Sequence, residues 1–243
     1  MLKLQDFSKT YRGGKKAVSG LTLTVAPGDI CGFIGRNGAG KTTSIRCIAG
    51  VLDFEGGDIL VNGHSIRREP LACKQVMAYV PDNPDLYDYL TGVQYLNFIA
   101  DIYEIPQNRR EANIRRWADA FELTANLGDP ISSYSHGMKQ KLALIGALVH
   151  EPRLLLLDEP FVGLDPSAVR VFKDVMTELC ASGGAVFFST HVLDVAEKIC
   201  NKVAIIRDGA LVASGETAAI RGDQSLESVF LELMDQEKAG AEG

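Results

Sequence analysis

The sequence contains no apolar run long enough to cross a membrane. A spanning helix needs about 20 apolar residues in a row, and the most apolar short stretches here are residues 154–157 and 203–206. The first residues also lack the apolar segment and cleavage site of a signal peptide. We therefore expect a chain that is soluble by itself and is not secreted, so that any membrane role must come through a partner.

A basic excess and paired cysteines are missing as well. Lys and Arg number 25 against 31 Asp and Glu, which gives a formal net charge of −6. Because neutralising nucleic-acid phosphates requires clustered Lys and Arg, this composition argues against general nucleic-acid binding. The five cysteines form no CxxC pair, and their odd number argues against a disulfide framework. A reducing cytosol is the compartment that fits best.

What the sequence does contain is an alternation of short apolar runs with helical patterns. Its 243 residues, 46% of them hydrophobic, suffice for one large domain or for one domain with an inserted lobe. Residues 30–34, 154–157 and 185–188 are predicted to be strands buried on both faces. A predicted helix over residues 166–180, between the last two strands, completes a β-α-β unit. The fold class is therefore α/β with a mostly parallel core sheet.

Other segments depart from this pattern. Residues 21–25 and 57–63 predict a small antiparallel sheet, and residues 203–213 predict a hairpin. We expect an inserted helical lobe, without strands, at residues 86–150. The predicted division of the chain is a core with its antiparallel β subdomain at 1–85 and 151–222, a helical subdomain at 86–150, and a C-terminal helix with a polar tail at 223–243.

A glycine-rich segment, residues 35–42, lies between a predicted strand and a predicted helix and reads Gly-Arg-Asn-Gly-Ala-Gly-Lys-Thr. This is the GxxxxGK[ST] pattern of a phosphate-binding loop, whose glycines let successive backbone N–H groups point at phosphate oxygens. Lys41 supplies charge for the β- and γ-phosphates, and Thr42 offers a hydroxyl to Mg²⁺. The strand–loop–helix setting disfavours the alternative, a glycine-rich turn that only caps a helix. The predicted ATP-binding residues of the loop are Gly35, Asn37, Gly38, Ala39, Gly40, Lys41, Thr42 and Thr43.

Two acids, Asp158 and Glu159, follow the apolar run at 154–157. The C-terminal ends of strands in an open α/β sheet face the crevice in which ligands bind. Asp158 is predicted to hold Mg²⁺ through its water shell, and Glu159 to polarise the attacking water as a general base. A solvated acidic turn is the alternative, which the phosphate loop disfavours. A GTPase is disfavoured because the guanine-reading NKxD pattern is absent.

Further segments follow one another in a fixed order along nearly the whole chain. Residues 134–140, Tyr-Ser-His-Gly-Met-Lys-Gln, precede an amphipathic helix; Gly-Leu-Asp follows the two acids, and Ser-Thr-His ends a predicted strand. These segments resemble the signature (usually LSGGQ), the D-loop and the switch histidine of the ATP-binding cassette (ABC) ATPases. An aromatic residue before the first sheet matches the family's adenine-stacking position. The residues that carry the match are Tyr11, Ser135, Gly137, Asp165 and His191.

The resemblance implies a P-loop NTPase fold of the ABC ATPase type, with a RecA-like core, in which two cassettes sandwich two ATP molecules head to tail. It implies that Tyr11 stacks on adenine and that Ser135 and Gly137 face the γ-phosphate held by the other subunit. His191 would contact the γ-phosphate as a catalytic residue beside Glu159 and Lys41. Asp165 would connect the two sites. Each of these residues alone has a structural alternative, such as an N-cap or a packed aromatic ring, which their joint occurrence disfavours.

Two departures from the family pattern bear on catalysis. His136 replaces the first glycine of the signature pair and Met138 replaces its glutamine. Asp82 stands where the family usually has a glutamine that meets Mg²⁺ and the attacking water; its shorter carboxylate remains a candidate metal ligand, with Asn83 as the fallback. With the apolar segment 226–231, these variants resemble the Ecs-like and drug-export group of bacterial ABC ATPases. In that group the ATPase and the membrane subunit are usually separate chains.

The segment after Asp82 is a candidate docking site. In the ABC family the surface between this loop and the helical lobe receives a coupling helix from the membrane subunit. Leu86, Tyr87 and Tyr89 are suitable apolar and aromatic anchors for such a helix. The alternative, that these side chains pack the lobe onto the core, is equally supported by the sequence.

The resemblance implies the ATP-hydrolysing subunit of a bacterial ABC transporter, an exporter, bound peripherally at the cytoplasmic face of the membrane. Its cofactors would be ATP and Mg²⁺. Its partners would be a second copy of itself or a homologous cassette, and an integral membrane subunit, with no nucleic acid. Two alternatives stay open: a soluble ABC ATPase acting elsewhere, although the interval from Lys41 to Ser135 is too short for a long coiled coil, and a regulatory cassette that binds ATP as a switch.

Overall fold

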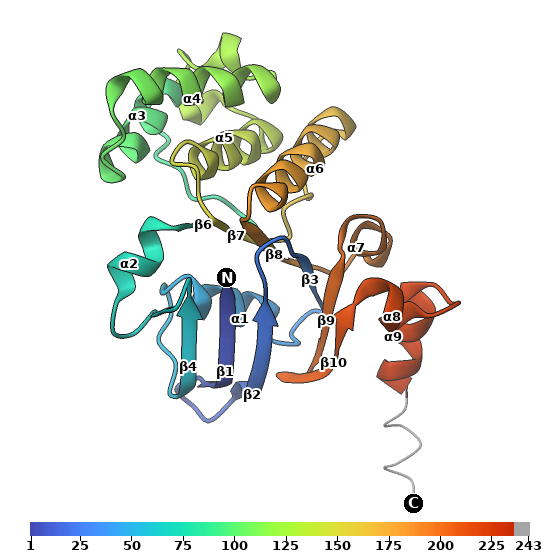
Figure 1. Ribbon diagram of the computed structural model, residues 1–243. Helices are drawn as coiled ribbons and strands as arrows, with labels where there is room; N and C mark the ends of the chain where they lie inside the picture. Colours follow the sequence, from blue (N-terminus) through green and yellow to red (C-terminus); the bar gives the residue numbers. More distant parts are fainter. Residues whose placement is uncertain (236–243) are drawn as a thin grey trace, which may run out of the picture.

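A six-stranded sheet runs through the centre of the molecule (Figure 1). The structure is a computed structural model that describes residues 1–235. The order of the strands is β10-β9-β3-β8-β7-β6, and every neighbouring pair is parallel except β9 and β10. The strands are β3 (Ile30–Ile34), β6 (Met77–Val80), β7 (Leu154–Asp158), β8 (Ala185–Thr190), β9 (Lys202–Arg207) and β10 (Ala210–Glu216).

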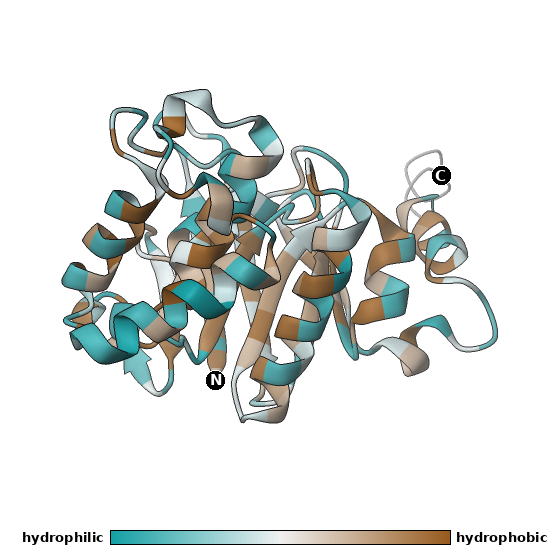
Figure 2. Ribbon diagram, turned by 90° about the horizontal axis from the view of Figure 1, so that it is seen from above, coloured by the Kyte–Doolittle hydropathy of each residue, from teal (hydrophilic) through white to brown (hydrophobic). Residues whose placement is uncertain are grey.

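This sheet separates two hydrophobic cores, because successive side chains of a strand point to opposite faces. In β7, Leu155 and Leu157 pack with the helices on one face, whereas Leu154 and Leu156 pack on the other face. Every residue of β3, β7 and β8 is buried, as their continuous apolar runs predict. Figure 2 shows the central strands mostly brown, and helices that carry teal residues alongside brown ones. A sheet covered on both faces fixes the strand ends firmly, and the ligand crevice lies at those ends.

A second, antiparallel sheet packs against the β7 face that carries Leu154 and Leu156. Its four strands have the order β2-β1-β4-β5, and α1 contributes Ile45 and Ile48 to the core between the two sheets. The sequence predicts part of β2 and most of β4, but neither β5 nor β1, which is the strand that pairs with both β2 and β4. The elements are β1 (Leu2–Thr10), β2 (Lys16–Val25), β4 (Gly56–Val61), β5 (His64–Ser65) and α1 (Lys41–Ile48).

Between β6 and β7 the chain forms helices and no extended strand, apart from one isolated bridge between Thr91 and Pro130. A capping box at Thr91 and Gln94 begins the first of these helices, and Ser135 caps the last. The single tryptophan, Trp117, is buried in the core that these helices share with the sheet. The elements are α3 (Gly92–Ile102), α4 (Gln107–Ala120), α5 (His136–Leu148) and the short 3-10 turns η1 (Thr124–Asn126) and η2 (Ile131–Ser133).

The remaining helices surround the sheet, and α6 connects β7 to β8 as the β-α-β pattern predicts. None of the helices within residues 1–235 is long and apolar enough to cross a membrane. All five cysteines are buried and free. The polar tail expected after the last helix lies, from residue 236 onward, outside the described residues. The elements are α2 (Pro70–Gln75), α6 (Pro166–Ala181), α7 (Leu193–Ile199), α8 (Thr217–Arg221) and α9 (Leu226–Asp235).

Candidate active site

A cavity of about 470 Å³ lies beside the glycine-rich loop that joins β3 to α1. It brings together side chains from both sheets and from the loops that follow β6 and β7. Most of the loop residues predicted to bind ATP line it, whereas Gly35 and Ala39 lie behind the lining. The predicted site residues that line the cavity are Tyr11, Asn37, Gly38, Gly40, Lys41, Thr42, Thr43, Asp82 and Glu159.

Two glycines of the loop are required by close backbone contacts. Gly40 has φ +106°, and a Cβ there would lie 2.4 Å from the carbonyl oxygen of Ala17. A Cβ on Gly35 would lie 2.6 Å from the carbonyl oxygen of Ile206. Any larger residue would push the loop away from the strands on which it rests. The loop is thus a packed backbone structure that ends at the N-terminus of α1, where the helix dipole favours anions.

Lys41 is buried at the first position of α1 and its ammonium group points back into the loop. Its Nζ donates hydrogen bonds to the carbonyl oxygens of Gly35 at 2.8 Å and Arg36 at 3.3 Å. Nζ also lies 3.9 Å from Oε1 of Glu159. Burial lowers the pKa of Lys41, and the nearby carboxylates of Glu159 and Asp158 oppose this shift. The cation and the carboxylate therefore face each other across the cavity.

Asp158 and Glu159 follow each other along the chain but have different surroundings. Asp158 is only 2% exposed and accepts a hydrogen bond of 2.5 Å from Oγ of Ser189 on β8. Glu159 has φ +49°, an uncommon conformation for a non-glycine residue. Its N–H donates to Oγ of Ser189 at 3.1 Å, and its Oε1 lies 2.9 Å from Nδ1 of His191. Ser189 thus holds both acids, and Glu159 is turned into the cavity.

The oxygen atoms around the loop suit a magnesium ion, which prefers hard oxygen ligands. Thr42 and Asp82 both line the cavity, and buried Asp158 lies directly before Glu159, which lines it too. The fallback residue Asn83 is exposed and is not part of the lining. Within residues 1–235, no three His, Cys, Asp or Glu side chains are grouped so that they could hold a metal by themselves. A magnesium ion here would need the Thr42 hydroxyl and nucleotide phosphates to complete its ligands.

Tyr11 lies directly after β1 and lines the cavity. Its side-chain hydroxyl forms a hydrogen bond of 3.1 Å with Oγ1 of Thr43, and the residue is 40% exposed. The ammonium group of Lys9 lies 5.6 Å from the centre of its ring. A half-exposed ring fixed at its hydroxyl end is suited to stack against a planar base.

Ser135, Gly137 and Asp165 do not line this cavity. Ser135 is the N-cap of α5, and its Oγ accepts a hydrogen bond of 3.3 Å from the N–H of Met138. Asp165 is the N-cap of α6 and accepts from the N–H of Ala168 at 2.8 Å. The structure therefore places the signature residues on a different surface from the phosphate loop of the same chain. Ser135 and Asp165 thus each cap a helix in this chain, and their roles toward a second chain stay predictions.

Comparison with known proteins decides the family. A sequence profile described as ABC transporter matches residues 18–162, more than half of the chain. The chain belongs to the ABC transporter family. The ABC-type transporter ATP-binding protein EcsA of Bacillus subtilis (strain 168) is 33% identical over 247 residues, which cover 100% of this chain and 99% of EcsA.

Two solved structures share the fold of this ABC protein. An ATP binding subunit of an ABC transporter is 33% identical and has a TM-score of 0.92, covering 96% of this chain and 99% of its own. The ATP-binding cassette MJ0796, solved as a dimer in a post-hydrolysis state bound to ADP and Pi, is 20% identical with a TM-score of 0.81, covering 89% and 99%. The predicted ABC ATPase fold is confirmed. This ABC protein is the ATP-binding subunit of a transporter, and its hydrolysis of ATP is coupled to transport.

The sequence does not predict every residue that lines the cavity of this ABC ATPase. Two come from turns: Asp208 and Gly209 join β9 to β10. Ser189 holds both acids, although the sequence points only to the histidine two positions later. Lys15 and Lys16 could have been found from the Gly-Gly-Lys-Lys run at residues 13–16, in which two cations follow a glycine turn. The lining residues without a predicted role are Lys15, Lys16, Ala17, Asp208 and Gly209.

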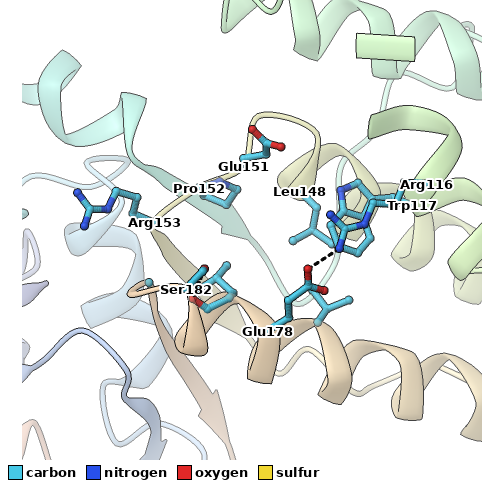
Figure 3. A pocket seen from close by; sticks show the side chains of 11 residues that line it. Arg116, Trp117, Leu148, Glu151, Pro152, Arg153, Glu178 and Ser182 are labelled. Atoms are coloured by element: carbon cyan, nitrogen blue, oxygen red, sulfur yellow. Dashed lines mark hydrogen bonds and ion pairs between the residues drawn. The ribbon is translucent and has the colours of Figure 1, made fainter. Parts of the chain in front are cut away.

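A second cavity, of about 270 Å³, lies between α4 and α6 of the ABC ATPase (Figure 3). Its wall is largely apolar and includes Trp117 and Leu148. The guanidinium of Arg116 lies 4.2 Å from the centre of the Trp117 ring and pairs at 2.6 Å with Glu178 of α6, the dashed line in Figure 3. None of the predicted site residues lines this cavity. We therefore assign it no part in nucleotide binding.

Proposed function

We propose that this ABC subunit powers export through a separate membrane subunit, by closing as a head-to-tail dimer on ATP and reopening after hydrolysis. The observation that carries the proposal is that Glu159, in the lining of the cavity, lies near both Lys41 of the phosphate loop and His191, which is outside the lining. Cation, carboxylate and imidazole are the groups that phosphoryl transfer to water requires. The direction of transport rests on the resemblance of the signature to the Ecs-like and drug-export group.

In the proposed reaction a water oxygen attacks the γ-phosphorus of ATP in line with the bond to the bridging oxygen. That bond breaks, ADP leaves with its electron pair, and phosphate forms. Glu159 takes the proton of the water, and His191, 2.9 Å away from its Oε1, holds the carboxylate in position and faces the γ-phosphate. Lys41 and the N–H groups of the loop offset the charge that develops on the phosphate oxygens. Lys41 must then exchange the carbonyl oxygens of Gly35 and Arg36 for phosphate oxygens.

The magnesium ion that we propose for this reaction would be held by the Thr42 hydroxyl and by Asp158 through water, with Asp82, which also lines the cavity, as a further candidate ligand. Bound there, it supplies a positive charge that neutralises the β- and γ-phosphates. The buried hydrogen bond from Ser189 to Asp158 keeps that carboxylate oriented. Asp82 reaches the cavity in spite of its short side chain, which supports its place among the candidate ligands.

The proposed dimer accounts for the placement of the signature. Ser135 and Gly137 lie at the N-terminus of α5, which favours an anion, yet they do not line the cavity of their own chain. In a head-to-tail pair they would face the γ-phosphate bound by the other chain. The dimeric MJ0796 cassette with ADP and Pi supports this arrangement. Asp165, beside the signature, would then lie near the dimer contact.

The proposed partner in the membrane would dock on the segment after Asp82. Tyr87 is 43% exposed and Tyr89 is 80% exposed, and the Tyr87 ring lies 5.6 Å from the ring of Phe98 on α3. Leu86 is only partly exposed and packs against the core. We therefore assign the docking role to the two tyrosines and a packing role to Leu86. Docking there would place the subunit peripherally at the cytoplasmic face of the membrane.

The purified subunit tests this proposal against an ATP-binding switch that does not turn over. The account predicts release of phosphate from ATP in the presence of Mg²⁺, with a specific activity that rises with protein concentration because the closed dimer is the active form. Loss of activity on removal of Mg²⁺ by a chelator is also expected. Absence of turnover at high protein concentration would favour the switch, and a strictly constant specific activity in a monomeric sample would contradict the dimer.

A further inference from the structure

The first turn of α5 touches the segment that follows Glu159 in the same chain. A Cβ placed on Gly163 would lie 2.5 Å from Cδ2 and 2.9 Å from Nε2 of His136, so the imidazole ring lies directly against Gly163. The family usually has glycine at the position of His136. In this chain the ring of His136 therefore occupies space that a glycine at position 136 would leave open.

Two further contacts join the same elements. A Cβ on Gly137 would lie 2.7 Å from the carbonyl oxygen of Gly163, so the two backbones approach as closely as a glycine allows. One turn further along α5, Nζ of Lys141 lies 2.7 Å from Oδ2 of Asp165. Lys141 is largely buried, and its ammonium group lowers the pKa of Asp165, to which the capping N–H of Ala168 adds. The contacts of His136, Gly137 and Lys141 therefore follow one another along α5, and their partners Gly163 and Asp165 lie in the same order along the chain.

The segment of residues 159–165 is itself firmly attached to the core. Its first residue, Glu159, is tied to Ser189, and its last, Asp165, caps α6. Between them, the ring of Phe161 packs edge-on against Phe188 of β8 at 5.6 Å and lies 6.0 Å from Phe172 of α6. The first turn of α5 is therefore held against the segment that carries the general base.

We propose that His136 is a positioning residue that, together with Lys141, locks the Ser135 turn to the segment 159–165. This inference rests on the proposed head-to-tail dimer. There, the Ser135 turn of one chain serves the ATP of its partner, whereas Glu159 of that chain serves its own ATP. Because the Ser135 turn and the segment 159–165 are joined within one chain, they link the two ATP sites of the dimer. Its effect is on closure and cooperativity, and the binding of ATP to a single chain does not depend on it.

The test measures ATP-driven dimerisation in the Glu159→Gln background, in which hydrolysis does not dissolve the closed pair. His136→Ala is expected to raise the dimer dissociation constant about fivefold, and the double variant His136→Ala, Lys141→Met more than tenfold. His136→Phe keeps a ring against Gly163 and should restore dimerisation. In the hydrolysing protein, His136→Ala should lower the Hill coefficient for ATP, while kcat at saturating ATP and protein stays within about twofold.

Lys139→Met is the matched control on the same helix, because Lys139 pairs at 2.6 Å with Asp88 and so points away from the segment 159–165. It should leave dimerisation unchanged. Binding of a fluorescent ATP analogue to dilute, monomeric protein should also be the same in every variant, and this control reports any loss of fold. Unchanged dimerisation and Hill coefficient in His136→Ala would overturn the inference. Failure of Glu159→Gln alone to dimerise with ATP would instead overturn the proposed function.

Discussion

Oε1 of Glu159 lies 2.9 Å from Nδ1 of His191, although 32 positions of the chain separate the two residues. The parallel pairing of β7 with β8 produces this meeting, because both residues follow the C-terminal ends of their strands. Ser189 strengthens it by donating to Asp158 and accepting from the N–H of Glu159. The general base Glu159 is thus positioned by the neighbouring strand β8, and its partner His191 follows the end of that same strand.

Replacement of His191 by Ala should reduce kcat for ATP hydrolysis by about 100-fold, within the range typical of a group that assists proton transfer. The affinity for ATP should change little, because the cavity lining that would bind the nucleotide, with Lys41, Thr42 and Tyr11, keeps all its residues in this variant. Steady-state phosphate release and nucleotide binding measure the two quantities separately. His64→Ala, which removes a half-buried histidine that pairs with Glu69 and lies outside that lining, should behave as the wild type. Equal losses of kcat in both variants would contradict the role of His191.

The two ends of Tyr11 can be tested separately. Tyr11→Phe keeps the ring and removes only a hydrogen bond within the protein, to Thr43, so the KM for ATP should stay within about twofold. Tyr11→Ala removes the ring and should raise KM about tenfold, as expected for the loss of base–aromatic stacking. The kcat at saturating ATP should be unchanged in both variants. If Tyr11→Phe is as impaired as Tyr11→Ala, the hydroxyl and not the ring is what matters.

His150 predicts a dependence of stability on pH. Its ring stacks on Tyr103 at 3.6 Å, and burial lowers its pKa from 6.5 to about 4, opposed by the hydrogen bond to the carbonyl of Met77. The unfolded imidazole therefore binds a proton between these values while the folded one does not. The free energy of unfolding should fall as pH falls below 6.5, by roughly 2 kcal/mol at about pH 5.

His150→Phe preserves a stacked ring and removes the titrating group. Denaturant unfolding of both proteins from about pH 7 to about pH 5 gives the comparison, in which the carboxylates contribute equally. The variant should lose less stability than the wild type over this range. Parallel pH profiles would show that His150 titrates alike in both states.

The continuous apolar runs of β3, β7 and β8 are visible in the sequence because a parallel strand is buried on both faces. β1 and β6 are not predicted: β6 has only four residues, and β1 is defined by pairing with two distant strands. The antiparallel sheet is therefore only partly predictable. The order of the strands in a sheet depends on tertiary packing, and the local hydrophobic periodicity of the sequence does not reveal it.

The phosphate loop and the two acids are predicted because each is a set of adjacent residues with a recognisable pattern. The cavity wall formed by Lys15, Lys16 and Asp208 is not, because these residues reach the loop from two turns in different sheets. The contact of His136 with Gly163 is likewise invisible in the sequence. There His136 is only a departure from a family pattern, whereas the structure places its ring against the segment after Glu159.

In the proposed mechanism Glu159 activates the water in a site that two chains complete. Glu159→Gln keeps the shape of the side chain and removes its basicity, so it separates ATP binding and dimerisation from hydrolysis. We expect phosphate release to fall by at least about 100-fold, while ATP binding persists and light scattering or gel filtration with ATP detects a stable dimer. Turnover at the wild-type rate in Glu159→Gln would contradict the account.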